Sequence, residues 1–224
     1  MISVVIPVLN EAARLEGLLD ALEAQEGEVE FIVVDGGSRD ATPSLAGGRA
    51  RLLTAPPGRA GQMNAGAPAA SGEILLFLHS DTRLPAGAFG LIEEAMREPG
   101  AVGGGFLHRF DRDDWFSRFI SLSANTRSRL CRLFFGDQAI FVRREVFEHL
   151  GGYADMPLFE DWDFTARLRK EGRVVFIRSP VETSGRRIDA WGKRKAFAIW
   201  WGFSILYALG VPLKRLARYY GDIR

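Results

Sequence analysis

Acidic side chains in this sequence follow short apolar runs, and the clearest case lies at residues 74–81 (ILLFLHSD). The run ILLFL does not alternate with polar residues, which is typical of a strand buried on both faces in a parallel sheet. Open parallel sheets bind ligands beyond the carboxyl ends of their strands, where His79, Ser80 and Asp81 would lie. We therefore interpret Asp81 as a metal ligand and build the rest of the site around it.

Three other predicted element ends carry acidic or amide groups, namely Asn10-Glu11, Asp35 and Glu160-Asp161. The carboxyl ends of parallel strands converge on one edge of a sheet, and carboxylates crowded there repel one another unless a cation is present. Any one of these acids alone is more typical of a loop or a helix cap. Together they indicate a hard divalent ion, whose coordination substrate phosphates usually complete. The sequence thus predicts a phosphate-bearing ligand such as a nucleotide.

The elements that must position these groups alternate between strand and helix. Apolar runs predict strands at residues 3–8, 30–34, 51–55, 74–81, 102–110, 136–142 and 174–177. Helical spacing predicts helices at 11–22, 88–96, 111–131, 144–150 and 158–170, with shorter pieces after residue 40 and within 56–72. Thr42 or Asp40 would cap the short helix that has Pro43 near its start. This order favours an α/β sandwich with a mainly parallel sheet.

Composition sets the class of protein. The chain of 224 residues has a net charge of +1, which gives no electrostatic basis for binding nucleic acid. Its single cysteine, Cys131, excludes an intramolecular disulfide, and its N-terminus lacks the features of a signal peptide. We expect a cytoplasmic protein, or one at the inner face of the cell membrane. Cys131, His108 and His149 have no partners at a recognisable spacing, and we interpret all three as structural.

The C-terminal segment differs from the rest. Residues 196–213 (AFAIWWGFSILYALGVPL) are almost wholly apolar or aromatic, with basic residues on both sides. Three interpretations remain open: a helix packed in the fold or in a homodimer, an element lying on an anionic membrane surface, and a spanning helix. Gly202, Gly210 and Pro212 interrupt the run and argue against the last. We divide the chain into a domain at 1–192 and a helical segment at 193–224.

Several motifs in order resemble the family-2 glycosyltransferases, and among them the branch called selenodomain-associated transferase 2. The matching stretches are VVIPVLNEA (4–12), VDGGSRDAT (34–42), GRAGQMNAGA (58–67), LLFLHSDT (75–82), GDQAIFVRREVFEHLGGY (136–153), FEDWDF (159–164) and SGRRI (184–188). The resemblance implies the GT-A fold, a Rossmann-like three-layer sandwich that binds nucleotide-diphosphate sugars. It also implies transfer of a sugar from a nucleotide sugar, usually UDP-linked, to an acceptor hydroxyl with inversion.

The resemblance implies roles for individual residues. Asp161 would be the general base for the acceptor hydroxyl, with Glu160 beside it. Asp81 would be the last residue of a DXD-type motif and hold Mg²⁺ or Mn²⁺ on the diphosphate. Asp35 would accept a hydrogen bond from the base. The residues that would contact the nucleotide sugar are Pro7, Asn10, Glu11, Asp35, Gly37, Arg59, Gln62, Asn64, Ser80, Asp81, Asp137, Gln138, Arg186 and Arg187.

The sequence departs from the family pattern at one point, because His79 stands where the first acid of the DXD motif is found. Imidazole binds Mn²⁺, whereas Mg²⁺ prefers oxygen ligands. His79 is therefore either a metal ligand or a histidine hydrogen-bonded near the strand end.

Two other functions compete with sugar transfer. A sugar-phosphate nucleotidyltransferase would open with a Gly-rich phosphate loop, but Asn10-Glu11 follows the first strand here. A non-catalytic, membrane-associated binding protein would not need to retain Asp35, Asp81 and Asp161. The aromatic and basic C-terminus favours a lipid-linked or otherwise apolar acceptor and a peripheral membrane contact.

Overall fold

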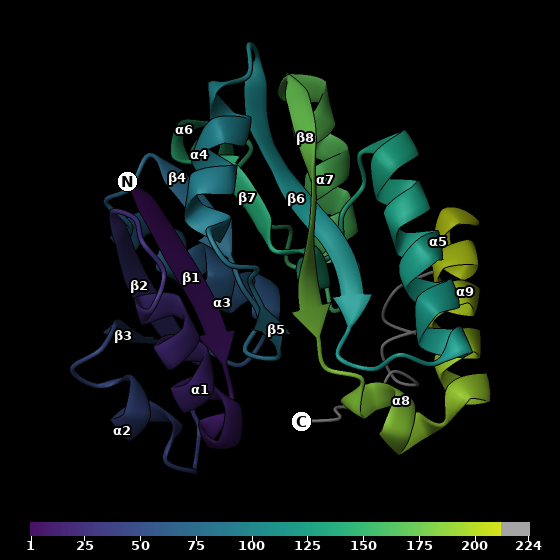
Figure 1. The fold of residues 1–224 in the computed structure, drawn as a ribbon, viewed down its shortest axis with the longest axis horizontal. Coiled ribbons are helices and arrows are strands. Elements are labelled where there is room, and N and C mark those ends of the chain that lie inside the picture. The colour runs from purple at the N-terminus through teal and green to yellow at the C-terminus, as the bar shows by residue number, and fades with distance from the viewer. Residues whose placement is uncertain (212–224) are drawn as a thin grey trace.

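The computed structural model describes residues 1–211 and contains one mixed sheet between layers of helices (Figure 1). Its strand order is β3-β2-β1-β4-β7-β6-β8-β5. The strands are β1 (Ile2–Val8), β2 (Val29–Asp35), β3 (Arg51–Thr54), β4 (Ile74–Phe77), β5 (Thr82–Arg83), β6 (Ala101–Phe110), β7 (Ile140–Arg143) and β8 (Arg173–Thr183). Four neighbouring pairs are parallel and three, all involving β5 or β7, are antiparallel. The predicted α/β sandwich with a mainly parallel mixed sheet is confirmed.

Helices cover both faces of this sheet. They are α1 (Ala12–Glu23), α2 (Thr42–Ala46), α3 (Arg59–Gly66), α4 (Ala88–Arg97), α5 (Trp115–Cys131), α6 (Arg144–His149), α7 (Glu160–Glu171), α8 (Arg186–Trp191) and α9 (Lys193–Ala208). Short 3₁₀ turns, η1 (Ala67–Ala69) and η2 (Gly136–Gln138), complete the described elements.

The central strands are buried on both faces, as their unbroken apolar runs predict. Val4 and Ile6 of β1 pack with α1 and α4, whereas Val5 between them packs with α3 and α7. In the same way Leu76 of β4 joins the first cluster, and Leu75 joins the second. Because successive side chains of a strand point to opposite faces, the two clusters form separate core layers. They hold the carboxyl ends of β1, β2 and β4 at one edge.

Three local predictions need correction. Residues 136–138 form the turn η2 rather than the start of a strand, so β7 begins only at Ile140. The last strand is far longer than residues 174–177, because β8 pairs along nearly all of β6. Neither Thr42 nor Asp40 is the cap residue of α2: Ala41 takes that place, and the Asp40 carboxylate accepts a hydrogen bond from the Thr42 N–H.

The C-terminal helix packs on the domain. Figure 1 shows α9 beside α5, beyond the β6–β8 side of the sheet. Trp200 of α9 stacks on Phe110 at the end of β6, and Phe197 and Trp201 contact Phe119 of α5. None of the helices within residues 1–211 is long and apolar enough to cross a membrane. Residues 212 and 213 of the predicted apolar segment lie outside the described part.

Candidate active site

Arg186 joins two of the acidic groups predicted from the sequence. Its Nη2 lies 2.9 Å from Glu11 Oε1 and 3.0 Å from Asp81 Oδ2. Glu11 follows β1 and Asp81 follows β4, which are neighbouring parallel strands. Arg186 reaches both carboxylates from the first turn of α8. Just before this helix, a hydrogen bond from Ser184 N to Asp81 O holds the chain beside Asp81. One guanidinium thus neutralises two largely buried carboxylates.

The charges around Asp81 decide its protonation state. Burial opposes its ionisation, but its interaction with His79 and the charges of Arg186, Arg187 and Arg59 outweigh burial and lower its pKa. Burial also lowers the pKa of His79 to about 4, with a further contribution from Arg59 and opposition from Asp81. At neutral pH the Asp81 carboxylate is therefore charged, and the His79 imidazole is neutral with a nitrogen lone pair.

Asp161 is a partly buried carboxylate at the start of α7. Its Oδ2 accepts a hydrogen bond of 2.7 Å from Gly136 N, and its Oδ1 accepts one of 2.7 Å from Trp162 N. Burial raises its pKa to about 7, and the charge of Glu160 adds to this, against the two hydrogen bonds. A carboxylate with a pKa near neutrality can take a proton from a substrate hydroxyl and release it again.

Gly136 links the Asp81 side of the site to the Asp161 side. Its N–H binds Asp161, and its missing side chain makes room for the His79 ring. A Cβ at Gly136 would lie 2.4 Å from His79 Cε1 and 2.6 Å from Nε2. Only glycine fits between these two side chains, which explains its place before Asp137 and Gln138.

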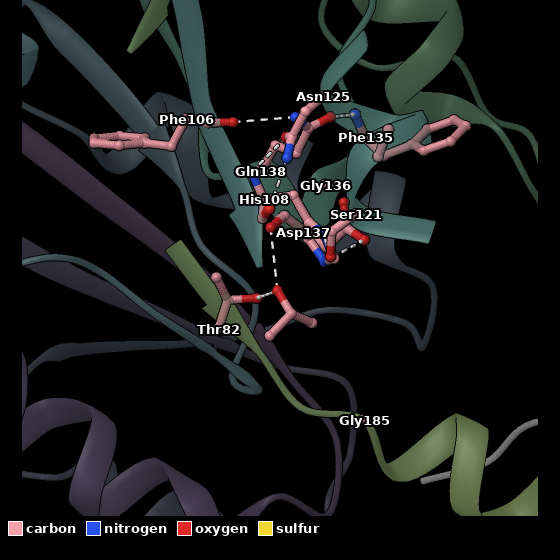
Figure 2. Close-up of polar contacts among 12 residues, drawn as sticks. Thr82, Phe106, His108, Ser121, Asn125, Phe135, Gly136, Asp137, Gln138 and Gly185 are labelled. Carbon is pink, nitrogen blue, oxygen red and sulfur yellow. Dashed lines mark hydrogen bonds and ion pairs between the residues drawn. The ribbon is translucent and has the colours of Figure 1, made fainter. Parts of the chain in front are cut away.

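Asp137 and Gln138 lie differently, although both belong to η2. The Gln138 amide is fully buried, and its oxygen and nitrogen are engaged by Phe106 O, Ser128 Oγ, Arg127 and Phe135 N. It holds the turn in place. The Asp137 side chain is only partly buried, and its Oδ2 lies 3.5 Å from Nε2 of His108 (Figure 2).

A cavity of about 900 Å³ contains much of this chemistry. Its charged and histidine lining residues include Arg59, His79, Asp81, Asp137, Glu160, Asp161 and Arg187. Aromatic and aliphatic side chains also line it, from the segment before α7, from α7 and from α9: Met156, Pro157, Leu158, Phe159, Trp162, Ile199, Trp200, Trp201, Phe203 and Ile205. The cavity therefore offers charged groups to one part of a ligand and an apolar wall to another.

The remaining predicted residues lie outside the lining of this cavity. Asp35 accepts hydrogen bonds from Gly37 N, Ser38 N and the Ser38 hydroxyl, and so shapes the loop after β2. Asn10 has a positive φ of 53° and accepts a hydrogen bond from Arg39 N. Pro7 is buried in β1, and Ser80 is buried after β4. The adjacent carboxyl ends of β1 and β2 bring Asn10 and Asp35 close, as the sequence predicts.

Two predicted ligand-binding residues have their side-chain amides occupied within the protein. Gln62 donates to Val8 O and Val34 O, and its oxygen accepts from Gly58 N. Asn64 donates to Tyr153 O and accepts from Tyr153 N. Both amides join separate chain segments, so nucleotide contacts from Gln62 and Asn64 stay a prediction from the resemblance alone.

Two residues that line the cavity had no functional signal in the sequence. His108, interpreted there as structural, lines the cavity, as does Arg127, whose guanidinium lies 3.9 Å from the centre of the Phe135 ring. They come from β6 and α5, and no motif or spacing relates them to Asp161. Only the packing of α5 on the sheet could reveal them.

The divalent metal can be tested against these residues. Within residues 1–211, no group of three or more His, Cys, Asp or Glu side chains forms a preformed metal cage. Asp81 supplies one carboxylate, and the neutral His79 beside it supplies a nitrogen. Divalent ions at nucleotide sites often have one or two protein ligands, with phosphates and water as the others. The residues fit an ion that arrives with its diphosphate.

The family is identified by comparison with known proteins. Residues 3–151 match the sequence profile of "Glycosyl transferase family 2". A Mycobacterium bovis protein named PGL/p-HBAD biosynthesis glycosyltransferase is 34% identical over 183 residues, covering 75% of this chain and 69% of that protein. An Aeromonas hydrophila protein named undecaprenyl-phosphate 4-deoxy-4-formamido-L-arabinose transferase is 31% identical over 139 residues, covering 56% of this chain and 42% of that protein.

Solved structures agree on the fold. The Mycobacterium tuberculosis glucosyl-3-phosphoglycerate synthase, determined with Mn²⁺, UDP and glucosyl-3-phosphoglycerate, superposes with a TM-score of 0.62 at 24% identity, covering 95% of this chain and 81% of that one. This chain spans only about six-tenths of several other solved chains that it matches. The narrower selenodomain-associated branch stays a prediction. The profile match and the arrangement of the sheet together lead to one conclusion: the chain belongs to glycosyl transferase family 2 and has the GT-A fold.

Proposed function

We propose that the chain transfers a sugar from a UDP-linked donor to a hydroxyl of an amphipathic, lipid-like acceptor, with inversion. The observation that carries this proposal is the single cavity in which Asp161 and Asp81 lie near an aromatic wall. A transferase needs a group for the leaving diphosphate and a base for the attacking hydroxyl on either side of the sugar. Asp81 with its arginines fits the first need, and Asp161 fits the second.

Asp161 would act on the acceptor. Its carboxylate would take the proton of the acceptor hydroxyl while that oxygen forms a bond to the anomeric carbon and the bond to the diphosphate breaks. Glu160 keeps its charge close to Asp161 and helps to hold the pKa near 7, so it tunes the base. Attack from the side opposite the leaving group inverts the anomeric carbon.

Negative charge develops on the diphosphate as it leaves. Arg59 and Arg187 line the cavity near Asp81, and Arg186 bridges Asp81 to Glu11. Preorganised cations placed where charge develops lower the barrier more than mobile water does. A Mn²⁺ or Mg²⁺ ion held by Asp81 and His79 would supply further stabilisation of the same charge.

The aromatic part of the cavity supports an apolar acceptor. The wall from Met156 to Trp162 and from α9 would bind a hydrocarbon or ring system, while its hydroxyl points to Asp161. The Aeromonas hydrophila relative is named for a transferase of undecaprenyl phosphate, which agrees with this class. The apolar contact would distinguish this acceptor from a water-soluble acceptor such as a sugar phosphate.

A membrane contact follows from the outer side of the same helices. Trp115, Phe119, Phe197 and Trp201 are exposed on α5 and α9, and Lys193, Arg194 and Lys195 open α9. Aromatic side chains with neighbouring cations favour the interface of an anionic membrane. We infer that α5 and α9 rest on such a surface, which would supply a lipid acceptor to the adjacent cavity, at the inner face of the cell membrane.

A binding screen and a pair of variants test the proposed function. Thermal shifts with UDP, GDP and their sugars, each with and without Mn²⁺, should give the largest shift for a UDP-sugar with Mn²⁺. Asp81→Ala should weaken the metal-dependent binding, and Asp161→Asn should retain it while losing transfer. Full turnover of both variants with a true acceptor would refute the assignment. Pyrophosphate release from a nucleoside triphosphate would indicate a nucleotidyltransferase instead.

A further inference from the structure

A buried histidine points at an acidic side chain of the cavity. His108 lies on β6 and is 2% exposed, and its Nδ1 is 3.1 Å from the hydroxyl of Ser121 on α5. Asn125 holds the His108 backbone through both its N–H and its C=O, and the His108 ring packs edge-on against Phe110. Figure 2 shows His108, Ser121 and Asn125 near Asp137. The imidazole is therefore fixed in position before any ligand binds.

Two buried atoms of this group have no hydrogen-bond partner among the described residues. They are Nε2 of His108 and Oδ1 of Asp137. The Asp137 Oδ2 lies 3.5 Å from His108 Nε2, too far for a good hydrogen bond. Unsatisfied buried polar atoms are rare in folded proteins. Both residues belong to the lining of the cavity, so a ligand could supply the missing partners.

The arrangement favours one tautomer of the imidazole. A carboxylate only accepts, so a proton on the nitrogen that faces Asp137, with Nδ1 accepting from Ser121, suits both neighbours. Burial lowers the pKa of His108, which keeps the ring neutral. Ser121, His108 and Asp137 are the residue types of a hydrolytic serine–histidine–aspartate triad, but the serine and the carboxylate have exchanged places. The Ser121 hydroxyl is buried away from the cavity, and the Asp137 carboxylate faces the cavity.

The position of Asp137 indicates which part of a substrate it meets. Its charge acts on His79, on the Asp81 side, and also on Asp161. The turn that carries it is held by the hydrogen bond from Gly136 N to Asp161 and by the one from the Thr183 hydroxyl to Asp137 O. The transferred sugar must lie between the diphosphate and the attacking hydroxyl, and a carboxylate whose charge acts on both sides is suited to contact it.

We propose that His108 and Asp137 together bind one hydroxyl of the transferred sugar, His108 Nε2–H donating to its oxygen and the Asp137 carboxylate accepting its proton. This inference rests on the proposed function, because it names the sugar of the same donor. His108 is then a specificity-determining residue, although no sequence motif contains it. A donor that lacks this hydroxyl leaves both groups without partners and is rejected.

The test compares nucleotide with nucleotide-sugar binding. The dissociation constants of UDP, UDP-glucose, UDP-galactose and UDP-N-acetylglucosamine are measured by calorimetry with Mn²⁺ for the wild type, His108→Phe and His108→Asn. We expect the best sugar donor to bind the variants about 3–10-fold more weakly relative to UDP, with UDP itself unchanged. His149→Phe removes a surface histidine and is the matched control.

Deoxy analogues of the best donor complete the cycle. Removing one particular hydroxyl should weaken wild-type binding about 3–10-fold and should have no further effect in His108→Phe. The inference would be overturned if both variants kept the wild-type ratio of donor affinity to UDP affinity. It would also be overturned if the effect of the His108 substitution and the effect of the missing hydroxyl were additive. Absence of any nucleotide binding by the wild type would instead refute the proposed function.

A measurement without substrate checks the geometry. The chain has three histidines, so ring ¹⁵N–¹H correlation spectra of the wild type and the His108 and His149 variants assign each imidazole. The wild type should show His108 protonated at Nε2 alone. Protonation at Nδ1 would contradict the inference whether or not the chain transfers sugar.

Discussion

The environment of Asp161 leads to a specific prediction about the pH dependence of stability and activity. Burial and the charge of Glu160 raise its pKa from 3.8 to about 7. At about 1.4 kcal/mol for each pH unit, ionising this carboxyl in the folded protein costs about 4 kcal/mol more than in the unfolded chain. Between pH 4 and 7 the native state binds more protons than the unfolded state at this group, so its contribution to stability falls as the pH rises.

Asp161→Asn removes the ionisation and therefore its cost at pH 8. The asparagine nitrogen must face one of the two backbone donors, Gly136 N or Trp162 N, and this mismatch costs about 1–3 kcal/mol. The variant should be more stable than the wild type by about 1–3 kcal/mol at pH 8, and less stable at pH 4.5. Sugar transfer should fall about 10²–10⁴-fold, because the base is lost.

Two assays follow this reasoning. Urea unfolding of both proteins at pH 4.5 and 8 gives the free energies, and kcat/KM from pH 5 to 9 gives the titration of the free enzyme. Activity should rise with pH and level off above an apparent pKa near 7. If Asp161→Asn were less stable than the wild type at both pH values, the pKa of the Asp161 carboxyl would not be near neutrality. An acid limb of the kcat/KM profile centred below pH 5 would lead to the same conclusion.

Other predictions concern the groups around this base. Arg186→Ala leaves Glu11 and Asp81 without their shared cation, so it should destabilise the protein by about 3–5 kcal/mol and enlarge the thermal shift that Mn²⁺ produces. The control Arg178→Ala, on the surface of β8, should do neither. Gly136→Ala should destabilise the protein by about 1–3 kcal/mol and lower its activity, because the new Cβ would meet His79. Gly17→Ala in α1 should instead stabilise the protein by about 0.5–1 kcal/mol. Equal effects of the two substitutions would contradict the close packing of Gly136 against His79. Trp201→Glu should reduce co-sedimentation with phosphatidylglycerol vesicles, and unaltered partitioning would count against the α5–α9 membrane surface.

The sequence by itself determined the alternation of strands and helices and the acidic ends of three of them. Apolar runs such as residues 74–78 can only be buried on both faces, and that property follows from local composition. The same runs place Asn10, Asp35 and Asp81 at one edge, because parallel strands end on the same side. The order of the motifs was specific enough to identify the family, and the profile match confirmed it.

Tertiary structure alone decided how these groups are paired. The partner of Asp81 and Glu11 is Arg186, which lies 105 and 175 residues away along the chain. The pKa of Asp161 depends on burial and on Glu160, and Phe159, the residue that caps the start of α7, stacks on Tyr207 of α9. His108 faces Asp137 only because the turn η2 packs against β6. Charge, burial and hydrogen bonding are set by neighbours in space, and no local pattern in the sequence encodes which neighbours these will be.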